Sequence, residues 1–304
     1  MALQTGEFAP TPTHRITACL LLPLLQCIAG CATVPLQQTG SLSSYERLQP
    51  DDGLFTKARV SVDKGAVLAA KTVRIVPTTY SPAAATAKLS VRDRTLVANA
   101  VDRSVCIGLS DRFRIVLPPQ MADLTVHVSI ASIVPTDEIA AATSKVLDIG
   151  QSVVTSVGVV ETSAPIPSVR VPIGLGGIAL EAEAVDPAGH QRAGMLWARG
   201  ANSFTGNTRV SPVGDAYELA SSFGGDFSEL LVTGVSPFSS KLPSLPSMHS
   251  LKSSFGGAPK ESACDAFGRV GVTDLLAGSL GLPPGWTDKG GQADQATHAT
   301  HLPP

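Results

Sequence analysis

The 304-residue chain has few charged and few aromatic residues, which make up 16% and 5% of it respectively. Its 23 Lys and Arg balance 25 Asp and Glu, so the formal net charge is only −2, and no block of basic residues stands out. Nucleic-acid-binding domains carry such a basic cluster, so we expect no nucleic-acid partner. The chain also lacks an uninterrupted apolar run of about 20 residues, the length that a membrane-spanning helix requires.

The motifs of the common hydrolases are also absent. A serine hydrolase presents its nucleophile in a Gly-x-Ser-x-Gly turn, and the nearest sequence here surrounds Ser236. Pro237 follows that serine and removes a backbone N–H that an oxyanion hole would use. We therefore assign no catalytic role to Ser236 and predict that the protein is not an enzyme.

Metal and nucleotide sites are not indicated either. His127 and His190 stand alone in the sequence, and the closely spaced His298 and His301 lie in the terminal segment. Convergent ligand spacing, as in zinc sites, is therefore missing. The glycines at 174, 176 and 177 are not followed by the Lys-Ser/Thr pair of a phosphate-binding loop. We expect no metal and no cofactor.

The most informative stretch present is Ile28-Ala29-Gly30-Cys31. It follows a thin basic region at His14 and Arg15 and an apolar segment over residues 16–25, an order typical of a secretory signal. Small residues that end in a cysteine resemble a bacterial lipobox. In that interpretation the chain is cut between Gly30 and Cys31, and the Cys31 thiol is lipidated. The alternative is an ordinary signal peptide in which Cys31 has no special role.

Lipidation of Cys31 would anchor the mature chain to a membrane, because each buried CH₂ group contributes about 0.8 kcal/mol. Ala32 follows the cysteine, and in the sorting of such lipoproteins a residue other than aspartate favours the outer membrane. We therefore expect a lipid-anchored, periplasm-facing protein of the bacterial outer membrane, with the inner membrane as the alternative.

The few cysteines agree with export. Cys19 and Cys27 would leave with the leader, and Cys31 would be acylated. Cys106 and Cys264 then remain as an even pair in an oxidising compartment, where disulfides persist. We predict a Cys106–Cys264 disulfide; the alternative is two separate buried thiols.

Hydrophobic periodicity predicts both helices and strands. Residues 88–110 carry an apolar stripe at every fourth position, after a capping pair formed by Ser90 and Asp93. Residues 123–134 alternate like a half-buried strand, and residues 177–185 and 192–199 predict a hairpin. Glu181 and Glu183 would lie on its solvated face and pair with Arg192 or Arg199. Further strands are expected at 72–77 and 113–117, and further helices at 138–150 and after Ser211-Pro212.

These elements predict an α+β fold with a mixed or mostly antiparallel sheet of about five strands and helices packed mainly on one face. The predicted organisation begins with a signal peptide (1–30) and a lipidated cysteine with its tether (31–60). An α/β domain (61–235) and a linker rich in Pro, Ser and Gly (236–262) follow. A C-terminal helical segment (263–287) and a disordered tail (288–304) complete the chain.

Three stretches, residues 40–50, 177–186 and 214–216, resemble in their order a family of uncharacterised bacterial lipoproteins, domain of unknown function 3313. The resemblance covers about residues 40–235. It implies an exported α/β domain on a lipid anchor, and it brings no catalytic residues.

The function expected from these observations is a non-catalytic module that binds another envelope protein or supports the assembly of an envelope machine. The alternative is a carrier of a small molecule or lipid, with an apolar cleft around residues 146–180. An envelope hydrolase is a third interpretation, and it would need a polar, convergent cleft that the sequence does not show.

Overall fold

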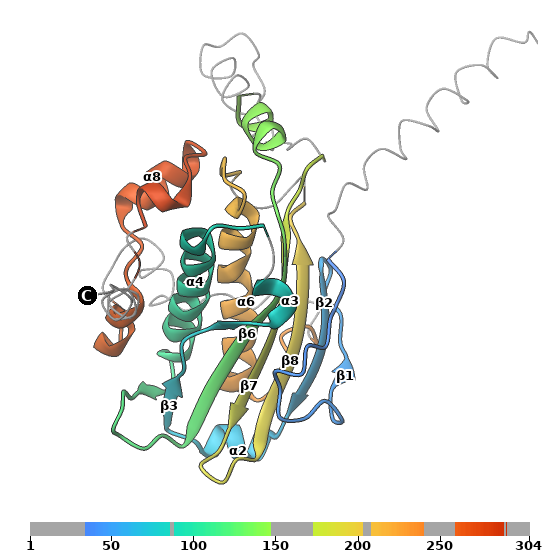
Figure 1. Cartoon of the computed structure of the whole chain (residues 1–304). Helices are drawn as coiled ribbons and strands as arrows, with labels where there is room; N and C mark the ends of the chain where they lie inside the picture. The colour runs from blue at the N-terminus through green and yellow to red at the C-terminus, as the bar shows by residue number, and fades with distance from the viewer. Residues whose placement is uncertain are drawn as a thin grey trace, which may run out of the picture. The chain divides into compact units, whose positions relative to one another are not determined.

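A mixed sheet organises the part of the chain that the computed structural model describes, which is residues 34–85, 88–146, 173–202, 208–239, 259–288 and 290 (Figure 1). The strands are β1 (Gln49–Pro50), β2 (Thr56–Val62), β3 (Thr72–Ile75), β4 (Thr79–Tyr80), β5 (Arg114–Ile115), β6 (Leu124–Val134), β7 (Gly177–Val185) and β8 (Gln191–Gly200). Their order is β1-β2-β8-β7-β6-β3-β5, with β4 beside β6. The neighbouring strands β1, β2, β8, β7 and β6 pair antiparallel, whereas β3, β4 and β5 pair parallel to their neighbours.

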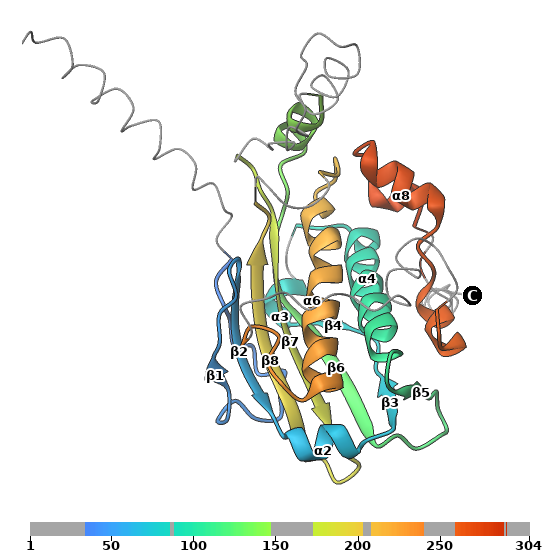
Figure 2. The ribbon, with the colours of Figure 1, turned by 180° about the vertical axis from the view of Figure 1, so that it is seen from behind.

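The described helices are α2 (Lys64–Ala69), α3 (Pro82–Ala85), α4 (Val91–Leu109), α6 (Gly214–Thr233) and α8 (Val272–Ser279), with 3-10 turns η3 (Ser262–Phe267) and η4 (Pro284–Trp286). Residues 138–146 are also helical. The two long helices, α4 and α6, lie side by side on one face of the sheet (Figures 1 and 2). None of the described helices combines the length and the apolar character needed to cross a bilayer.

The predicted α+β class is confirmed, and so is the packing of helices mainly on one face. The sheet has eight strands among the described residues instead of about five. The strands at 72–77, 113–117, 123–134, 177–185 and 192–199 were expected, and β1, β2 and β4 are additional. β1 and β4 are only two residues long, too short for an alternating pattern to be visible in the sequence. β2 lies in a segment whose composition predicted a tether.

Helix α4 forms where its capping pair and apolar stripe predicted it. The Ser90 hydroxyl accepts a hydrogen bond from the Asp93 backbone N–H at 3.0 Å and donates one to the Asp93 carboxylate at 2.6 Å. Val97, Val101 and Val105 are fully buried against the sheet and α6. The predicted apolar stripe therefore faces the core and packs mostly against α6.

Close contact between α4 and α6 depends on glycine. A β-carbon at Gly224 of α6 would collide with Ser104 of α4, and one at Gly108 of α4 would collide with Ser228 of α6. Glycine inside a helix costs about 1 kcal/mol relative to alanine, and at Gly224 the close approach of α4 is the packing reason for it.

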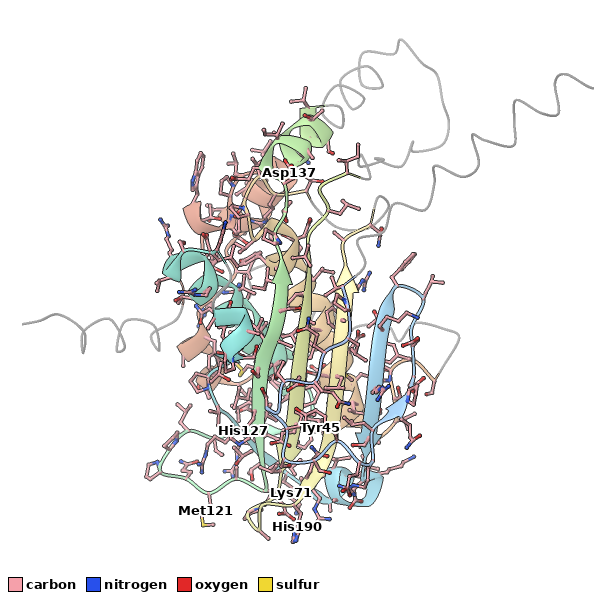
Figure 3. All side chains as sticks on the ribbon, turned by 45° about the vertical axis from the view of Figure 1, so that its right-hand side comes forward. Tyr45, Lys71, Met121, His127, Asp137 and His190 are labelled. Atoms are coloured by element: carbon pink, nitrogen blue, oxygen red, sulfur yellow. A yellow bond between two sulfur atoms is a disulfide. The ribbon has the colours of Figure 1, made fainter. Side chains whose placement is uncertain are left out.

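A segment that we call the strap, residues 34–48, covers the opposite face of the sheet. Its Val34 packs with small residues of β6, β7 and β8, and its Leu42 and Leu48 pack on Leu196. Tyr45 of the strap lies in front of the strands in Figure 3. The folded domain thus begins earlier than the predicted boundary at residue 61, and residues 34–60, predicted as tether, are part of it. The sequence concealed this because Leu42, Tyr45 and Leu48 are spaced as on a helix, whereas the strap forms neither a helix nor a strand.

The C-terminal segment packs beside α4, and the helical segment expected at 263–287 consists of the three short pieces η3, α8 and η4. Asp288, predicted to begin a disordered tail, is buried. Most of the predicted linker at 236–262 and the tail beyond Gly290 lie outside the described residues, as do residues 147–150 of the helix expected at 138–150.

Candidate functional site

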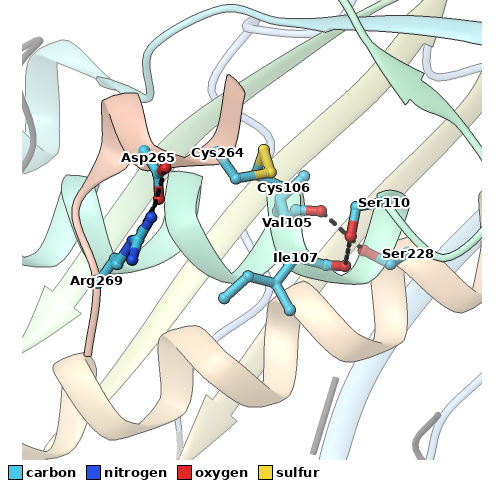
Figure 4. Close-up of a disulfide and its surroundings, with 8 residues drawn as sticks. All are labelled: Val105, Cys106, Ile107, Ser110, Ser228, Cys264, Asp265 and Arg269. Carbon is cyan, nitrogen blue, oxygen red and sulfur yellow. Dashed lines mark hydrogen bonds and ion pairs between the residues drawn. A yellow bond between two sulfur atoms is a disulfide. The ribbon is translucent and has the colours of Figure 1, made fainter. Parts of the chain in front are cut away.

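The predicted cleavage and lipidation residues, Gly30 and Cys31, lie outside the described residues. Cys106 and Cys264 are joined by a disulfide with a Cα–Cα distance of 5.7 Å (Figure 4). Cys106 lies on the buried face of α4 and Cys264 in η3, and both are at most 1% exposed. The bond therefore fastens the C-terminal segment to the helical layer across a sequence separation of 158 residues.

The strap is held by a buried carboxylate on the outer face of the sheet. Glu181 of β7 is fully buried, and its two oxygens accept four hydrogen bonds from the strap. Thr39 donates from its backbone N–H and its hydroxyl at 2.7 and 2.8 Å. Ser41 donates its N–H at 3.1 Å, and Tyr45 its hydroxyl at 2.9 Å. Hydrogen bonds to a buried charged group are among the strong ones.

Glu183, two residues along the same strand, repeats this arrangement. Its carboxylate accepts hydrogen bonds from the Ser43 backbone N–H and hydroxyl at 2.8 and 2.6 Å, and from the Gln191 amide at 2.8 Å. The sequence suggested that Glu181 and Glu183 lie in solvent and pair with Arg192 or Arg199. That interpretation is wrong, because the strap removes both carboxylates from water and supplies their donors instead. The signal in the sequence that could have indicated this cover is the alternation of two glutamates with apolar residues in an otherwise apolar strand.

We expect the Glu181→Gln substitution to loosen the strap by about 1–3 kcal/mol, because an amide has one acceptor oxygen for donors that now share two. Hydrogen exchange of the amides of residues 39–45 would measure the effect. Glu46→Gln is the matched control, since Glu46 lies on the exposed side of the strap. Equal exchange rates in both variants would contradict the assigned role of Glu181.

A hollow lies where the strap meets the β7–β8 turn, and its lining residues are Ser43, Ser44, Arg47, Gly189, His190, Gln191 and Arg192. Its charged groups already have partners. Arg192 forms ion pairs with Asp63 and Asp186 at 3.0 and 2.7 Å. A backbone hydrogen bond from His190, and then Arg192, lower the pKa of Asp186 to about 2. The charged groups of the hollow therefore stabilise the β7–β8 turn and the end of the strap.

A second buried group of charges joins α4 and α6 to the C-terminal segment. Arg103 of α4 donates to the Asp288 carboxylate at 2.8 Å and to the Tyr217 hydroxyl at 3.0 Å. Tyr217 of α6 also donates to Asp288, at 2.7 Å. Burial is the main cause that raises the pKa of Tyr217, so this hydroxyl stays protonated.

Arg209, just before α6, extends the group towards α8. Its guanidinium pairs with Asp274 of α8 at 3.1 Å and with Glu218 of α6, and it lies 5.1 Å from the Tyr217 ring. Both arginine side chains, Arg103 and Arg209, are at most 5% exposed. Every charge in this buried network has a partner of opposite sign. Such a network holds the C-terminal segment in one position.

Asp226 on α6 is a half-buried acid whose pKa is raised. Burial raises its pKa to about 6, although the Trp197 indole N–H donates to it at 2.7 Å and Arg199 lies near. The raised pKa means that the folded protein binds a proton here between about pH 4 and 6, whereas the unfolded chain does not. The contribution of this proton to stability is present below pH 4 and is lost as the pH rises through 6.

We therefore expect Asp226→Asn, which keeps an acceptor for Trp197, to remove this loss. Relative to the parent protein, the variant should gain on the order of 1–2 kcal/mol of unfolding free energy between pH 4 and pH 8. Urea denaturation at both pH values measures the difference. A parallel pH dependence in parent and variant would show that Asp226 does not titrate in this way.

The candidate chemical residues do not converge. His127 and His190 are both exposed, and the Ser236 hydroxyl accepts a hydrogen bond from the Phe238 backbone N–H. Among the described residues there is no group of three or more His, Cys, Asp or Glu arranged to hold a metal ion. The built features of this part of the chain are thus two buried polar attachments, one for the strap and one for the C-terminal segment.

The chain belongs to the family described as Protein of unknown function (DUF3313), whose family model matches residues 37–227. This confirms the resemblance inferred from residues 40–50, 177–186 and 214–216. The matched range begins within the strap and ends in α6, so it includes both strap-binding glutamates.

Among solved structures, the chain is similar to the PelC dodecamer from Paraburkholderia phytofirmans and to the dodecamer of a point variant of that protein, both at 10% sequence identity. Each match covers 59% of this chain and 97% of the PelC chain, with TM-scores of 0.31 and 0.30. At such scores the similarity carries no argument about function. No curated protein matches the chain.

Proposed function

We propose that this member of the family is an exported bacterial lipoprotein, anchored through lipidated Cys31, whose folded domain is a non-catalytic binding or assembly module of the cell envelope. It would face the periplasm from the outer membrane and contact another envelope protein. The observation that carries the proposal is the distribution of the cysteines. One follows the small residues of a lipobox, and the two that remain in the mature chain are bonded to each other.

The internal architecture supports a binding rather than a catalytic role. The buried polar groups that catalysis would require to meet a substrate are instead occupied by the strap and the C-terminal segment. Because these polar side chains attach the two segments to the domain, the surface of the domain is rigid and has defined edges. Such a surface suits a partner that docks on it.

The anchor is tested by expressing the full chain in a bacterial host, fractionating membranes and determining the mass of the mature N-terminal peptide. We expect a peptide that begins at Cys31 and carries acyl groups, found in the outer-membrane fraction. The Cys31→Ser variant should lack the acyl groups and leave the membrane. An uncleaved chain that retains Met1 and stays in the cytoplasm would refute the proposal.

The binding role is tested separately, by cross-linking the acylated protein in intact cells and identifying what it captures. A reproducible envelope protein is expected, and its absence from repeated experiments would count against a binding module. The apolar cleft expected around residues 146–180 for a carrier falls mostly outside the described residues.

A further inference from the structure

The end of the sheet where the strap begins is only a few residues along the chain from the proposed anchor at Cys31. Val34, the first described residue, is buried among Ala131, Ala179 and Ala198. A β-carbon at Gly177 would collide with the Val34 side chain, so glycine at this position lets the strap lie flat on the sheet. Val34 is three residues from Cys31, and three extended residues reach about 10 Å. An acylated Cys31 would therefore hold this end of the sheet against a lipid surface.

Large apolar side chains are exposed at the same end. Gly177 pairs with Gly200, and the neighbouring Arg199 pairs with Thr56 at the start of β2. Leu54 and Phe55 come immediately before Thr56 and are 90% and 40% exposed. The Phe55 ring lies 5.9 Å from the Arg199 guanidinium, which places it beside the last residues of β8.

The connection that leads into β7 adds two more. Ile173 is 67% exposed, and its neighbour Gly174 accepts a hydrogen bond from the Asp137 backbone N–H at 2.8 Å. Ile139, two residues after Asp137, is 80% exposed. Figure 3 shows Asp137 at this end of the strands and Met121 and His190 at the other. Leu54, Phe55, Ile139 and Ile173 therefore belong to the end from which the chain leaves toward Cys31.

We propose that Leu54, Phe55, Ile139 and Ile173 make a second, non-covalent contact with the lipid surface beside the anchor. The inference rests on the proposed lipidation of Cys31, because the short reach from Val34 is what brings these side chains to the bilayer. Exposed apolar side chains bind at the boundary between headgroups and acyl chains. Asp137 and Glu138 lie at the same end and require water or headgroups, so the contact is shallow.

The consequence is a fixed orientation of the domain. An acyl anchor on a flexible tether leaves a domain free to rotate, whereas an anchor combined with a docked end sets one direction. The β7–β8 turn and the connection between β5 and β6, at the opposite end, would then point away from the membrane and be open to a partner.

The test uses full-length acylated protein in vesicles of phosphatidylethanolamine, phosphatidylglycerol and phosphatidylcholine, with or without brominated acyl chains that quench tryptophan. Leu54→Trp and Ile139→Trp report on the proposed contact. Met121→Trp is the matched control, because Met121 is also 80% exposed but lies at the opposite end. The signal of the parent, from buried Trp197 and exposed Trp286, is subtracted.

We expect brominated lipid to reduce the added fluorescence in the Leu54→Trp and Ile139→Trp variants and not in Met121→Trp, with aqueous iodide giving the reverse order. Iodide quenching of all three variants alike would overturn the lipid contact while leaving the anchor intact. Shielding of the first two from both quenchers would overturn it in favour of a protein cover, from a second copy or from residues 147–172. The mass of the Cys31 peptide from the same sample separates the two proposals, because an unacylated Cys31 overturns both.

Discussion

Replacing both Cys106 and Cys264 by alanine is expected to lower the free energy of unfolding by about 2–5 kcal/mol. The bond closes a loop with a sequence separation of 158 residues, and chain-entropy reasoning gives about 5 kcal/mol as the upper value for a loop of that length. Both cysteines are buried, so each alanine also leaves a small gap in the contact between α4 and η3. The loss should be seen in urea denaturation of the folded domain.

Reductant provides the matched control for this experiment. Treating the parent protein with dithiothreitol should bring its stability down to that of the double variant, whose own stability should not respond. If the parent is equally stable with and without reductant under conditions that free both thiols, the disulfide does not stabilise this fold.

The Arg103→Met substitution in the parent protein is expected to lower the free energy of unfolding by about 3–5 kcal/mol, because it leaves the Asp288 carboxylate buried without its cationic partner. The side chains of Arg103 and Asp288 are only 5% and 3% exposed, and Tyr217 alone cannot neutralise the charge. Replacing a buried pair on one side is much more damaging than replacing both partners. Adding Asp288→Leu to Arg103→Met should therefore restore a large part of the lost stability.

A surface pair in the same C-terminal segment is the control. Arg269 and Asp265 form an ion pair at 2.6 Å with side chains 52% and 38% exposed (Figure 4). Solvent weakens such a pair, so Arg269→Met should change the free energy of unfolding by at most about 1 kcal/mol. Similar losses in Arg103→Met and Arg269→Met would contradict a special role for the buried network.

The same network predicts a dependence on acid. Although burial by itself raises the pKa of Asp288, the attraction of Arg103 and the hydrogen bonds it receives lower the pKa on balance. A lowered folded-state pKa contributes stability above the ordinary value near 4, and this contribution is lost as the pH falls further. The parent should lose it on acidification below pH 4, and the Arg103→Met variant should show a flatter response in the same titration.

The elements predicted best from the sequence are those whose partners can be inferred from spacing alone. The four-residue stripe of α4, the alternation of β6 and the β7–β8 hairpin all depend on local geometry, which repeats along the chain. Cys106 and Cys264 were paired because they are the two cysteines that remain in the predicted mature chain and because an oxidising compartment favours disulfides. The short strands β1 and β4 were invisible because two residues do not make a pattern, whereas β5 lies within the strand expected at 113–117.

The strap shows why the rest was not predictable. The residues that donate hydrogen bonds to Glu181 lie 136–142 positions earlier in the chain, and nothing in their own spacing points to a carboxylate. The glutamates were interpreted as a solvated face because alternation reveals which residues share a side of a strand. It does not reveal what covers that side.

The amino-acid sequence by itself determined the α+β class, the helical stripe, the central strands and the family, since each is encoded in short-range periodicity or in ordered local motifs. Only the tertiary structure decided that residues 34–48 cover the sheet, that Arg103 meets Asp288 and that four apolar side chains share the end of the sheet where the strap begins. Those contacts join residues far apart in the chain, and their energies arise from burial and geometry that exist only once the sheet has formed.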